Sequence, residues 1–299
     1  MSNAVVAQVK TNWTYFSLVL ASTFLQGSSF VATKIMLTSM PPLWVAAIRF
    51  FIAALSLLPL VIYRHIKDPV SLVDIPWLKL FVIGLFQTAG VMAFLNIGLS
   101  YTTPSTAAIL MASNPLLVVI LATVVLGERV SFRAILGLVV AFVGVVICIG
   151  IGGAHSTGIG WGEILVVLAS SCWAIATIIN KKFNLHLDPW VTTFWQMLMG
   201  SLVLFVVALW SQQPFALPTT GSHWLVFLWL AIPASTGAMG LWFAALKIGG
   251  AVHTSGFLFL CPLFSAIITY CALGTVLSMQ ELVGGILIGA GIYVLSRYR

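Results

Sequence analysis

Polar side chains with full amide groups lie inside long apolar runs of this 299-residue sequence, where lipid would offer them no hydrogen-bond partner. Two polar stripes recur at helical spacing: Gln26, Ser28, Ser29 and Thr33 in the first run, and Trp173, Thr177 and Asn180 in the sixth. A polar group at membrane depth is costly unless it is paired or hydrated. The amides therefore favour a wet cavity that binds a small solute, whereas the serines serve equally well as small residues that let helices pack closely.

A second group of polar and aromatic residues extends this prediction to other runs: Gln87, Asn96, Trp195, Gln196 and Trp242. The amides in this group are expected to face the protein interior, because lipid would leave them unpaired. Trp242 adds an aromatic wall to the cavity or packs in the core. His253, at the start of the ninth run, titrates near neutral pH or is a hydrogen-bonded histidine near the membrane interface.

Carboxylates are scarce, and this scarcity excludes several kinds of chemistry. None of the six Asp and Glu residues lies near the middle of an apolar run, so an antiport mechanism driven by a buried acid is not supported. The sequence contains no HExxH, GxSxG or P-loop motif, and its four cysteines lack metal-ligand spacing and are interpreted as small packing residues. We therefore expect no catalytic residue, no metal and no cofactor, in a protein that is not an enzyme.

The composition places these residues in a membrane protein. Of all residues, 61% are hydrophobic and 6% are charged, whereas a soluble domain carries roughly 25% charged residues. The net charge of +7 comes from Lys and Arg residues that are spread singly, mainly at the ends of apolar runs. This pattern orients helices in a bilayer and argues against nucleic-acid binding.

Apolar runs and their Pro and Gly breakers predict an all-α polytopic membrane protein with ten transmembrane helices, long enough to cross a hydrocarbon core of roughly 30 Å. Their ranges are 13–38, 42–63, 76–100, 104–126, 131–150, 160–183, 189–210, 223–247, 251–273 and 279–296. With the N-terminus inside, eleven cations at helix ends fall on the cytoplasmic side and Lys34 falls on the other. Both termini are therefore expected to be cytoplasmic.

The chain repeats itself at an offset of 147 residues without a gap, which predicts one five-helix repeat at 1–150 and a second at 151–299. Matched pairs include Lys34 with Lys181, Pro42 with Pro189, Gly90 with Gly237, Pro115 with Pro262 and Gly127 with Gly274. Because five is odd, equivalent helices cross the membrane in opposite directions, so the repeats are inverted and a site is expected between them. The stripes of helices one and six would then face each other, with Gln26 matched to Trp173 and Thr33 to Asn180.

Two features of the repeat concern motion and packing. Pro115 and Pro262 lie inside the fourth and ninth helices, where a proline kinks the backbone. Each is a candidate hinge for the rocking of the two halves, and a fixed kink that serves packing is the alternative. The glycine-rich helices 131–150 and 279–296 are expected to pack peripherally, against neighbours or another subunit, in a monomer or weak homo-oligomer.

Three segments resemble the EamA type of the drug/metabolite transporter superfamily: Gln26 to Lys34 (QGSSFVATK), Ala107 to Gly127 with the following Glu128-Arg129, and Cys172-Trp173-Ala174. Over its whole length the chain is most similar to the YddG-like amino-acid exporters of that type. The resemblance implies a ten-helix inverted-repeat carrier of the bacterial inner membrane, with helices one to four and six to nine around a central cavity. Many relatives carry Trp where this chain has Gln26, which bears on substrate preference.

Amides, hydroxyls and aromatic rings without a buried acid suit a neutral or zwitterionic solute. The sequence thus predicts a secondary transporter that exports amino acids and related metabolites by alternating access, with that solute and membrane lipid as its partners. A nucleotide-sugar carrier ranks lower, because phosphate needs cations and only Lys34, Arg49 and Lys181 come near the spans. The sequence also leaves open a drug or cation carrier of the same superfamily, and a membrane enzyme or flippase that uses the same groove.

Overall fold

The structure is a computed structural model that describes residues 13–67, 75–127, 132–149, 160–183, 185, 187–245, 248 and 257–297. Every regular element among these residues is a helix, as predicted. Seven of the described helices, from Trp13–Met36 to Gly221–Ala245, are long and apolar enough to cross a membrane. Three shorter apolar helices lie at Ile135–Ile147, Leu260–Leu273 and Met279–Gly291. The chain is therefore a multi-pass membrane protein.

The helices begin and end close to the predicted ranges. The first half contains α1 (Trp13–Met36), α2 (Pro42–Lys67), α3 (Trp77–Gly84), η1 (Leu85–Gly90), α4 (Val91–Tyr101), α5 (Pro104–Ala112), α6 (Asn114–Leu126) and α7 (Phe132–Ile149). The second half contains α8 (Trp161–Phe183), α9 (Pro189–Trp210), α10 (Gly221–Ala231), η2 (Ile232–Gly237), a helical stretch at 238–245, η3 (Phe257–Phe259), α12 (Leu260–Leu273) and α13 (Met279–Arg297). The boundaries agree because the expected signals operate: the Thr103 and Asp188 side chains cap α5 and α9, and a proline follows each cap.

Irregular backbone falls at equivalent positions in the two halves, 147 residues apart. The π-helix η1 lies between α3 and α4, and the π-helix η2 lies between α10 and the stretch at 238–245. Gly127 and Gly274, just after α6 and α12, are both left-handed, with φ of 67° and 68°, a conformation that other residues adopt only with strain. The apolar pattern does not predict the π-helices, because one extra residue in a turn leaves a run of apolar residues intact.

The two candidate hinge prolines differ from the prediction of a kink inside a continuous helix. Helix α5 ends at Ala112 and α6 begins at Asn114, so Pro115 lies in the first turn of α6. In the second half, η3 precedes α12, and Pro262 lies in the first turn of α12. In the first half the kink is a break at Ser113, whereas in the second half the 3₁₀ turn η3 runs directly into α12. The first turn of a helix leaves its N–H groups unpaired and so tolerates proline in both. The hinge role stays a prediction.

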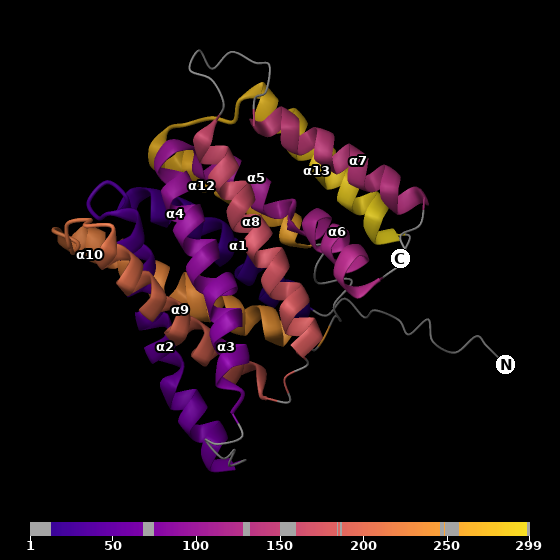
Figure 1. Ribbon diagram of the computed structural model, residues 1–299. Coiled ribbons are helices and arrows are strands. Elements are labelled where there is room, and N and C mark those ends of the chain that lie inside the picture. The colour runs from indigo at the N-terminus through magenta and orange to yellow at the C-terminus, as the bar shows by residue number, and fades with distance from the viewer. Residues whose placement is uncertain are drawn as a thin grey trace.

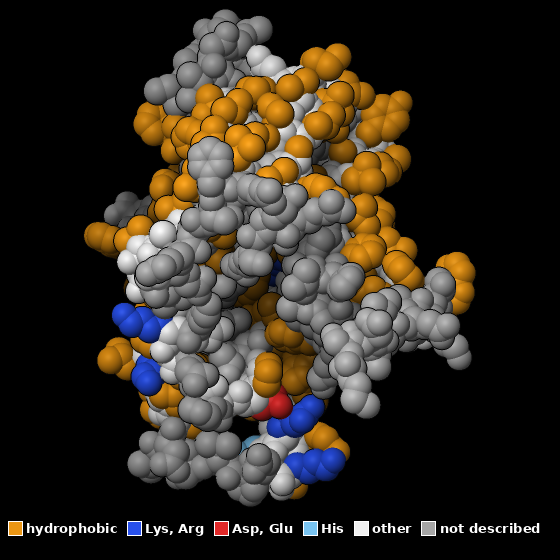
Figure 2. Space-filling view, turned by 90° about the vertical axis from the view of Figure 1, so that its right-hand side faces the viewer, with side chains coloured by type: hydrophobic (Ala, Val, Ile, Leu, Met, Phe, Trp, Pro, Cys, Tyr) orange, Lys and Arg blue, Asp and Glu red, His pale blue; other side chains and the backbone are white. Residues whose placement is uncertain are grey.

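Helices α7 and α13 lie side by side at one edge of the molecule, as Figure 1 shows. Small residues bring their backbones together and fix an antiparallel course: Gly144 lies against Gly284 and Ile288, and Gly291 lies against Gly137 and Ala141. Figure 2 shows the side of the molecule on which α7 and α13 lie, and hydrophobic side chains cover its upper part. Such a surface suits contact with lipid tails, and the pair lies at the periphery as expected.

The other helices pack across the two halves of the chain. Helix α2 packs against α9, α4 against α8, and α1 against α12 and α10. One buried cluster, which includes Leu99 and Leu110, draws side chains from α4, α5, α8 and α13. A second, which includes Trp44 and Leu204, draws them from α1, α2, α9 and α10. Since both clusters combine residues from the two halves, the core lies between the halves and not within each one.

Candidate functional site

Arg49 lies buried where α1, α2 and η2 meet, with 5% of its surface exposed. Its Nε donates a hydrogen bond to Ser235 Oγ of η2 at 2.9 Å, and its Nη1 donates to Thr33 Oγ1 of α1 at 3.4 Å. The guanidinium carbon lies 4.9 Å from the centre of the Phe50 ring. A cation inside a membrane-spanning helix needs a compensating interaction, so this group of residues is a candidate functional site. We call Thr33, Arg49 and Ser235 the arginine cluster.

The arginine cluster contains one predicted cavity residue, Thr33, and two residues outside the predicted set. Arg49 has a signal in the sequence, because a lone Arg within the apolar run 42–63 needs an explanation by the same rule as the amides. Ser235 has no such signal. Its contact with Arg49 depends on the course of the π-helix η2, which the apolar pattern does not predict.

The other polar residues of α1 are bonded within their own helix and to the second half of the chain. Gln26 is half-buried, and its Nε2 donates to Ser22 Oγ at 3.0 Å. Ser22 Oγ in turn donates to the carbonyl of Ala238, directly after η2, at 2.8 Å. Ser29 is half-buried and donates to the Gln26 carbonyl at 2.7 Å. The polar face of α1 therefore follows the boundary with the second half.

The α8 stripe lies apart from the α1 stripe. Helices α1 and α8 make few contacts with each other, because α8 packs against α4 and α6. Trp173 is half-buried against the cluster around Leu110, and the Thr177 hydroxyl donates to the Trp173 carbonyl at 2.9 Å. Thr177 and Asn180 are exposed. In a membrane these two side chains face either a wet space or lipid, and cavity lining stays the prediction for both.

The amides of the third and seventh predicted helices differ in burial and in partners. Asn96 of α4 is fully buried, with Nδ2 donating to the Pro42 carbonyl at 3.1 Å and Oδ1 enclosed without a partner. Gln87 is half-buried in η1. Gln196 is buried in α9, at the position equivalent to Arg49. Interior placement thus holds for Asn96 and Gln196, as expected for amides that lipid would leave unpaired.

The predicted aromatic residues have other neighbours. Trp195 is half-buried and packs edge to face on Trp77, with 4.7 Å between ring centroids, and on Phe194, at 5.0 Å. These contacts provide Trp195 with a packing role at the edge of the buried cluster that contains Phe194. Trp242 is half-buried in the helical stretch at 238–245. His253 lies outside the described residues.

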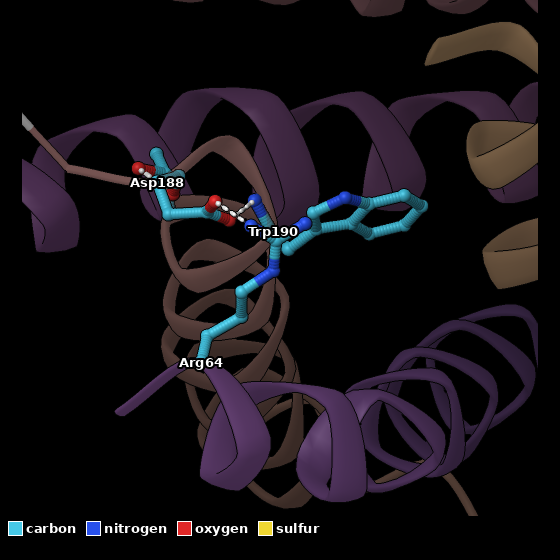
Figure 3. Close-up of polar contacts among 4 residues, drawn as sticks. Arg64, Asp188 and Trp190 are labelled. Carbon is cyan, nitrogen blue, oxygen red and sulfur yellow. Dashed lines mark hydrogen bonds and ion pairs between the residues drawn. The ribbon is translucent and has the colours of Figure 1, made fainter. Parts of the chain in front are cut away.

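Charged side chains join helices at the two ends of α2. Near its start, Lys34 of α1 donates to the carbonyls of Leu99 and Thr102 at the end of α4, and the Thr102 hydroxyl donates to Glu163 of α8. Near its end, Arg64 forms a 3.4 Å ion pair with Asp188, whose other carboxylate oxygen accepts a 2.8 Å hydrogen bond from the Trp190 N–H at the start of α9 (Figure 3). Different helices are therefore tied together at the two ends.

A hollow opens near the middle of the face shown in Figure 2, with a Lys or Arg side chain in its depth. A different pocket, of about 260 Å³, lies between α5, α12 and α13 and is lined mainly by apolar side chains, with Pro262 and Glu281 among them. Glu281 accepts hydrogen bonds from the Thr103 and Thr106 hydroxyls and from the Ser278 N–H. This carboxylate caps α13 and ties it to α5, which is a structural role.

A model of the EamA-like transporter family matches this chain twice, at residues 13–150 and 160–297. An uncharacterized transporter of Archaeoglobus fulgidus is 30% identical over 93% of this chain and 96% of its own length. The uncharacterized transporter YyaM of Bacillus subtilis is 28% identical over 94% and 93%. A probable amino-acid metabolite efflux pump of Salmonella typhimurium is 27% identical over 90% of each chain. One protein of known crystal structure shares the fold, with a TM-score of 0.62, 20% identity and 94% coverage of each chain.

Proposed function

Because this chain belongs to the EamA-like transporter family, we propose that it exports amino acids and related small metabolites by alternating access through a cavity between two inverted five-helix repeats. The family model matches each half once, so the assignment to this family rests on nearly the whole chain. The similarity to a probable amino-acid metabolite efflux pump supports the substrate class.

The observation that carries the proposed mechanism is the presence of matching helix interruptions in the two halves. The π-helices η1 and η2 are equivalent, and Pro115 and Pro262 each lie in the first turn of a helix that follows irregular backbone, which is Ser113 in one half and the 3₁₀ turn η3 in the other. Transporters built from inverted repeats form their substrate sites from discontinuous helices near the midplane, where freed backbone groups and polar side chains meet the solute. Here η1 contributes Gln87 and η2 contributes Ser235.

The antiparallel course of α7 and α13 supports the inversion. These helices are equivalent at the offset of 147 residues, and repeats of the same orientation would cross the membrane in the same direction. An even number of crossings returns the two termini to one side. The excess of Lys and Arg at that side favours the cytoplasm, in the inner membrane of a bacterium.

Alternating access requires the two ends of the cavity to open in turn. The contacts of Lys34 and Glu163 at one end, and of Arg64 and Asp188 at the other, join different sets of helices. We expect the contacts at one end to separate when the halves rock, while those at the other end persist.

Counterflow in proteoliposomes tests the proposed function. The purified protein is reconstituted into liposomes, and separate batches are loaded with each member of a panel of amino acids. The same amino acid, radiolabelled, is then added outside the liposomes. Saturable uptake of at least one amino acid is expected, and empty liposomes provide the background. Absence of saturable uptake for every member of the panel would refute export of amino acids.

A further inference from the structure

Arg49 is a cation in α2, whose most apolar stretch of 18 residues has a mean hydropathy of 2.4, and both of its hydrogen-bond partners are neutral hydroxyls. Among the residues that the structure describes, no carboxylate lies within ion-pairing distance of its guanidinium. Burial of a charge without a counter-charge is strongly unfavourable in a low-dielectric interior. The hydroxyls of Thr33 and Ser235 orient the guanidinium without neutralising it.

The hydrogen-bond capacity of Arg49 is partly unused. A guanidinium has about five N–H donors in a planar fork. In the described part of the chain, one donor on Nε goes to Ser235 and one on Nη1 goes to Thr33, and Nη2 has no partner. Arg49 is nevertheless almost wholly enclosed, with 5% of its surface exposed, so these N–H groups have little access to solvent. A bound ligand would therefore supply acceptors that the described residues do not give to this edge of the fork.

A guanidinium edge without protein partners matches oxyanions that accept two parallel bonds, which are carboxylate and phosphate, and the single charge of Arg49 suits the singly charged carboxylate. Two parallel N–H bonds to the two carboxylate oxygens satisfy both partners, and the opposite charges offset the desolvation of each. A protonated amine would be repelled from the same position. The position equivalent to Arg49 in the second half is occupied by the neutral Gln196, so the described chain offers this feature in one half only.

We propose that Arg49, oriented by Thr33 and Ser235, is the binding residue for a substrate carboxylate, and that the transported solutes are small carboxylates, amino acids among them. This inference rests on the proposed transport function and adds what the site recognises. Amines that lack a carboxylate would be excluded. A single arginine suits one carboxylate, and so favours monocarboxylates and neutral zwitterions over diacids.

Wild-type protein tests the inference without any substitution. Competition against labelled L-leucine or L-phenylalanine counterflow compares three unlabelled analogues: the amino acid, its amide (L-leucinamide or L-phenylalaninamide), and the acid without the amine (4-methylpentanoate or 3-phenylpropionate). We expect the amides to compete about 10- to 100-fold less well than the parent amino acids, because a charge-assisted pair is lost. The amine-free acids should still compete. Equal competition by amides and acids would overturn the assignment.

Two substitutions locate the effect at Arg49. Arg49→Lys keeps the charge but loses the planar fork, and should retain a reduced preference for acids over amides. Arg49→Gln removes the charge and should abolish that preference. Gel filtration and circular dichroism verify that each variant is folded. A folded Arg49→Gln protein that still prefers acids would overturn the assignment, and if it does not fold, the wild-type comparison of acids and amides decides.

Ligand-induced stabilisation separates failure of this inference from failure of the proposed function. The melting temperature of purified wild-type protein is measured with 3-phenylpropionate and with 3-phenylpropanamide, since a bound ligand raises apparent stability. Stabilisation by the acid alone supports the carboxylate site even if no amino acid is transported. Transport of amino acids combined with equal stabilisation by acid and amide would leave the function standing and remove Arg49 from recognition.

Discussion

The two halves of this chain place polar residues at the same three positions, but one half carries a charge and the other does not. The arginine cluster consists of Thr33, Arg49 and Ser235. The equivalent residues, 147 positions away, are Asn180, Gln196 and Thr88, which we call the glutamine cluster. Two side-chain hydrogen bonds connect the members of the arginine cluster to one another. Among the described residues, no side-chain hydrogen bond connects the members of the glutamine cluster.

The difference between the clusters extends to the packing around them. Beside the glutamine cluster, Gly200 lets α9 approach η1 so closely that a Cβ at this position would lie 2.4 Å from the Thr88 Cβ. The equivalent residue in the first half is Ala53, whose carbonyl accepts hydrogen bonds from Ser56 and Thr236. The same arrangement of helices therefore forms a tight backbone contact at the glutamine cluster. At the arginine cluster it surrounds a cation with hydroxyl groups. A repeat thus need not imply two equal binding sites.

The largest effect is expected when each cluster loses its central polar group through the same substitution. Arg49→Met should reduce amino-acid counterflow by about 10- to 100-fold, because the substrate carboxylate loses a charged partner. Gln196→Met replaces an amide with an apolar chain of similar length and should reduce it only a few-fold. Initial rates in proteoliposomes at matched protein content measure both. Equal losses in the two variants would contradict the asymmetry between the clusters.

The positions of the helices could be predicted from the sequence because Pro, Gly and capping residues mark their ends. Helix α9 begins and ends at the predicted residues, Pro189 and Trp210, with Asp188 as its cap. The π-helices could not be predicted, since an inserted residue changes hydrogen bonding but not the apolar pattern. The irregular backbone before the two prolines also depends on which turn of the helix each proline occupies, which apolar runs do not specify.

The site was harder to predict than the fold. The rule that polar groups at depth need partners identifies Thr33, Asn96 and Gln196, which are buried, but it also selects Thr177 and Asn180, which are exposed. Periodicity assigns a residue to a helix face, and only packing decides what that face meets. Trp195 illustrates the same limit, because its ring packs on Trp77 and an apolar pattern cannot pair two aromatic residues from different helices.

A substitution at Gly200 tests the tight packing of the glutamine cluster. Gly200→Ala should lower the free energy of unfolding by about 1–3 kcal/mol, because the new Cβ would clash with Thr88 Cβ and the Gly84 carbonyl. Gly289→Ala in α13 is the matched control, since a Cβ there meets no atom within 4 Å. Thermal unfolding in detergent measures both variants. Equal melting temperatures for the two variants would show that α9 and η1 do not pack this closely.

A smaller effect is expected at Ser235, which positions Arg49. Its hydroxyl accepts from Arg49 Nε at 2.9 Å and donates to the Leu230 carbonyl at 2.8 Å. Ser235→Ala should raise the KM for amino acids a few-fold with little change in kcat, because one neutral hydrogen-bond acceptor is worth about 0.5–1.5 kcal/mol. Ser235→Thr retains the hydroxyl and should restore the KM. A fall in kcat that threonine does not rescue would instead indicate a role in helix packing.

The smallest effect is expected at Asp188, whose ion pair with Arg64 is partly exposed and already balances that cation. Asp188→Asn keeps an oxygen that can accept from the Trp190 N–H and removes only the charge, so it should change stability by less than about 1 kcal/mol. Asp188→Ala also removes the helix cap and should cost about 1 kcal/mol. Thermal unfolding at low and high salt separates the two contributions. If Asp188→Asn is as destabilising as Asp188→Ala, the charge of Asp188 and not its capping bond holds this end together, and the partly exposed Arg64 depends on its counter-charge.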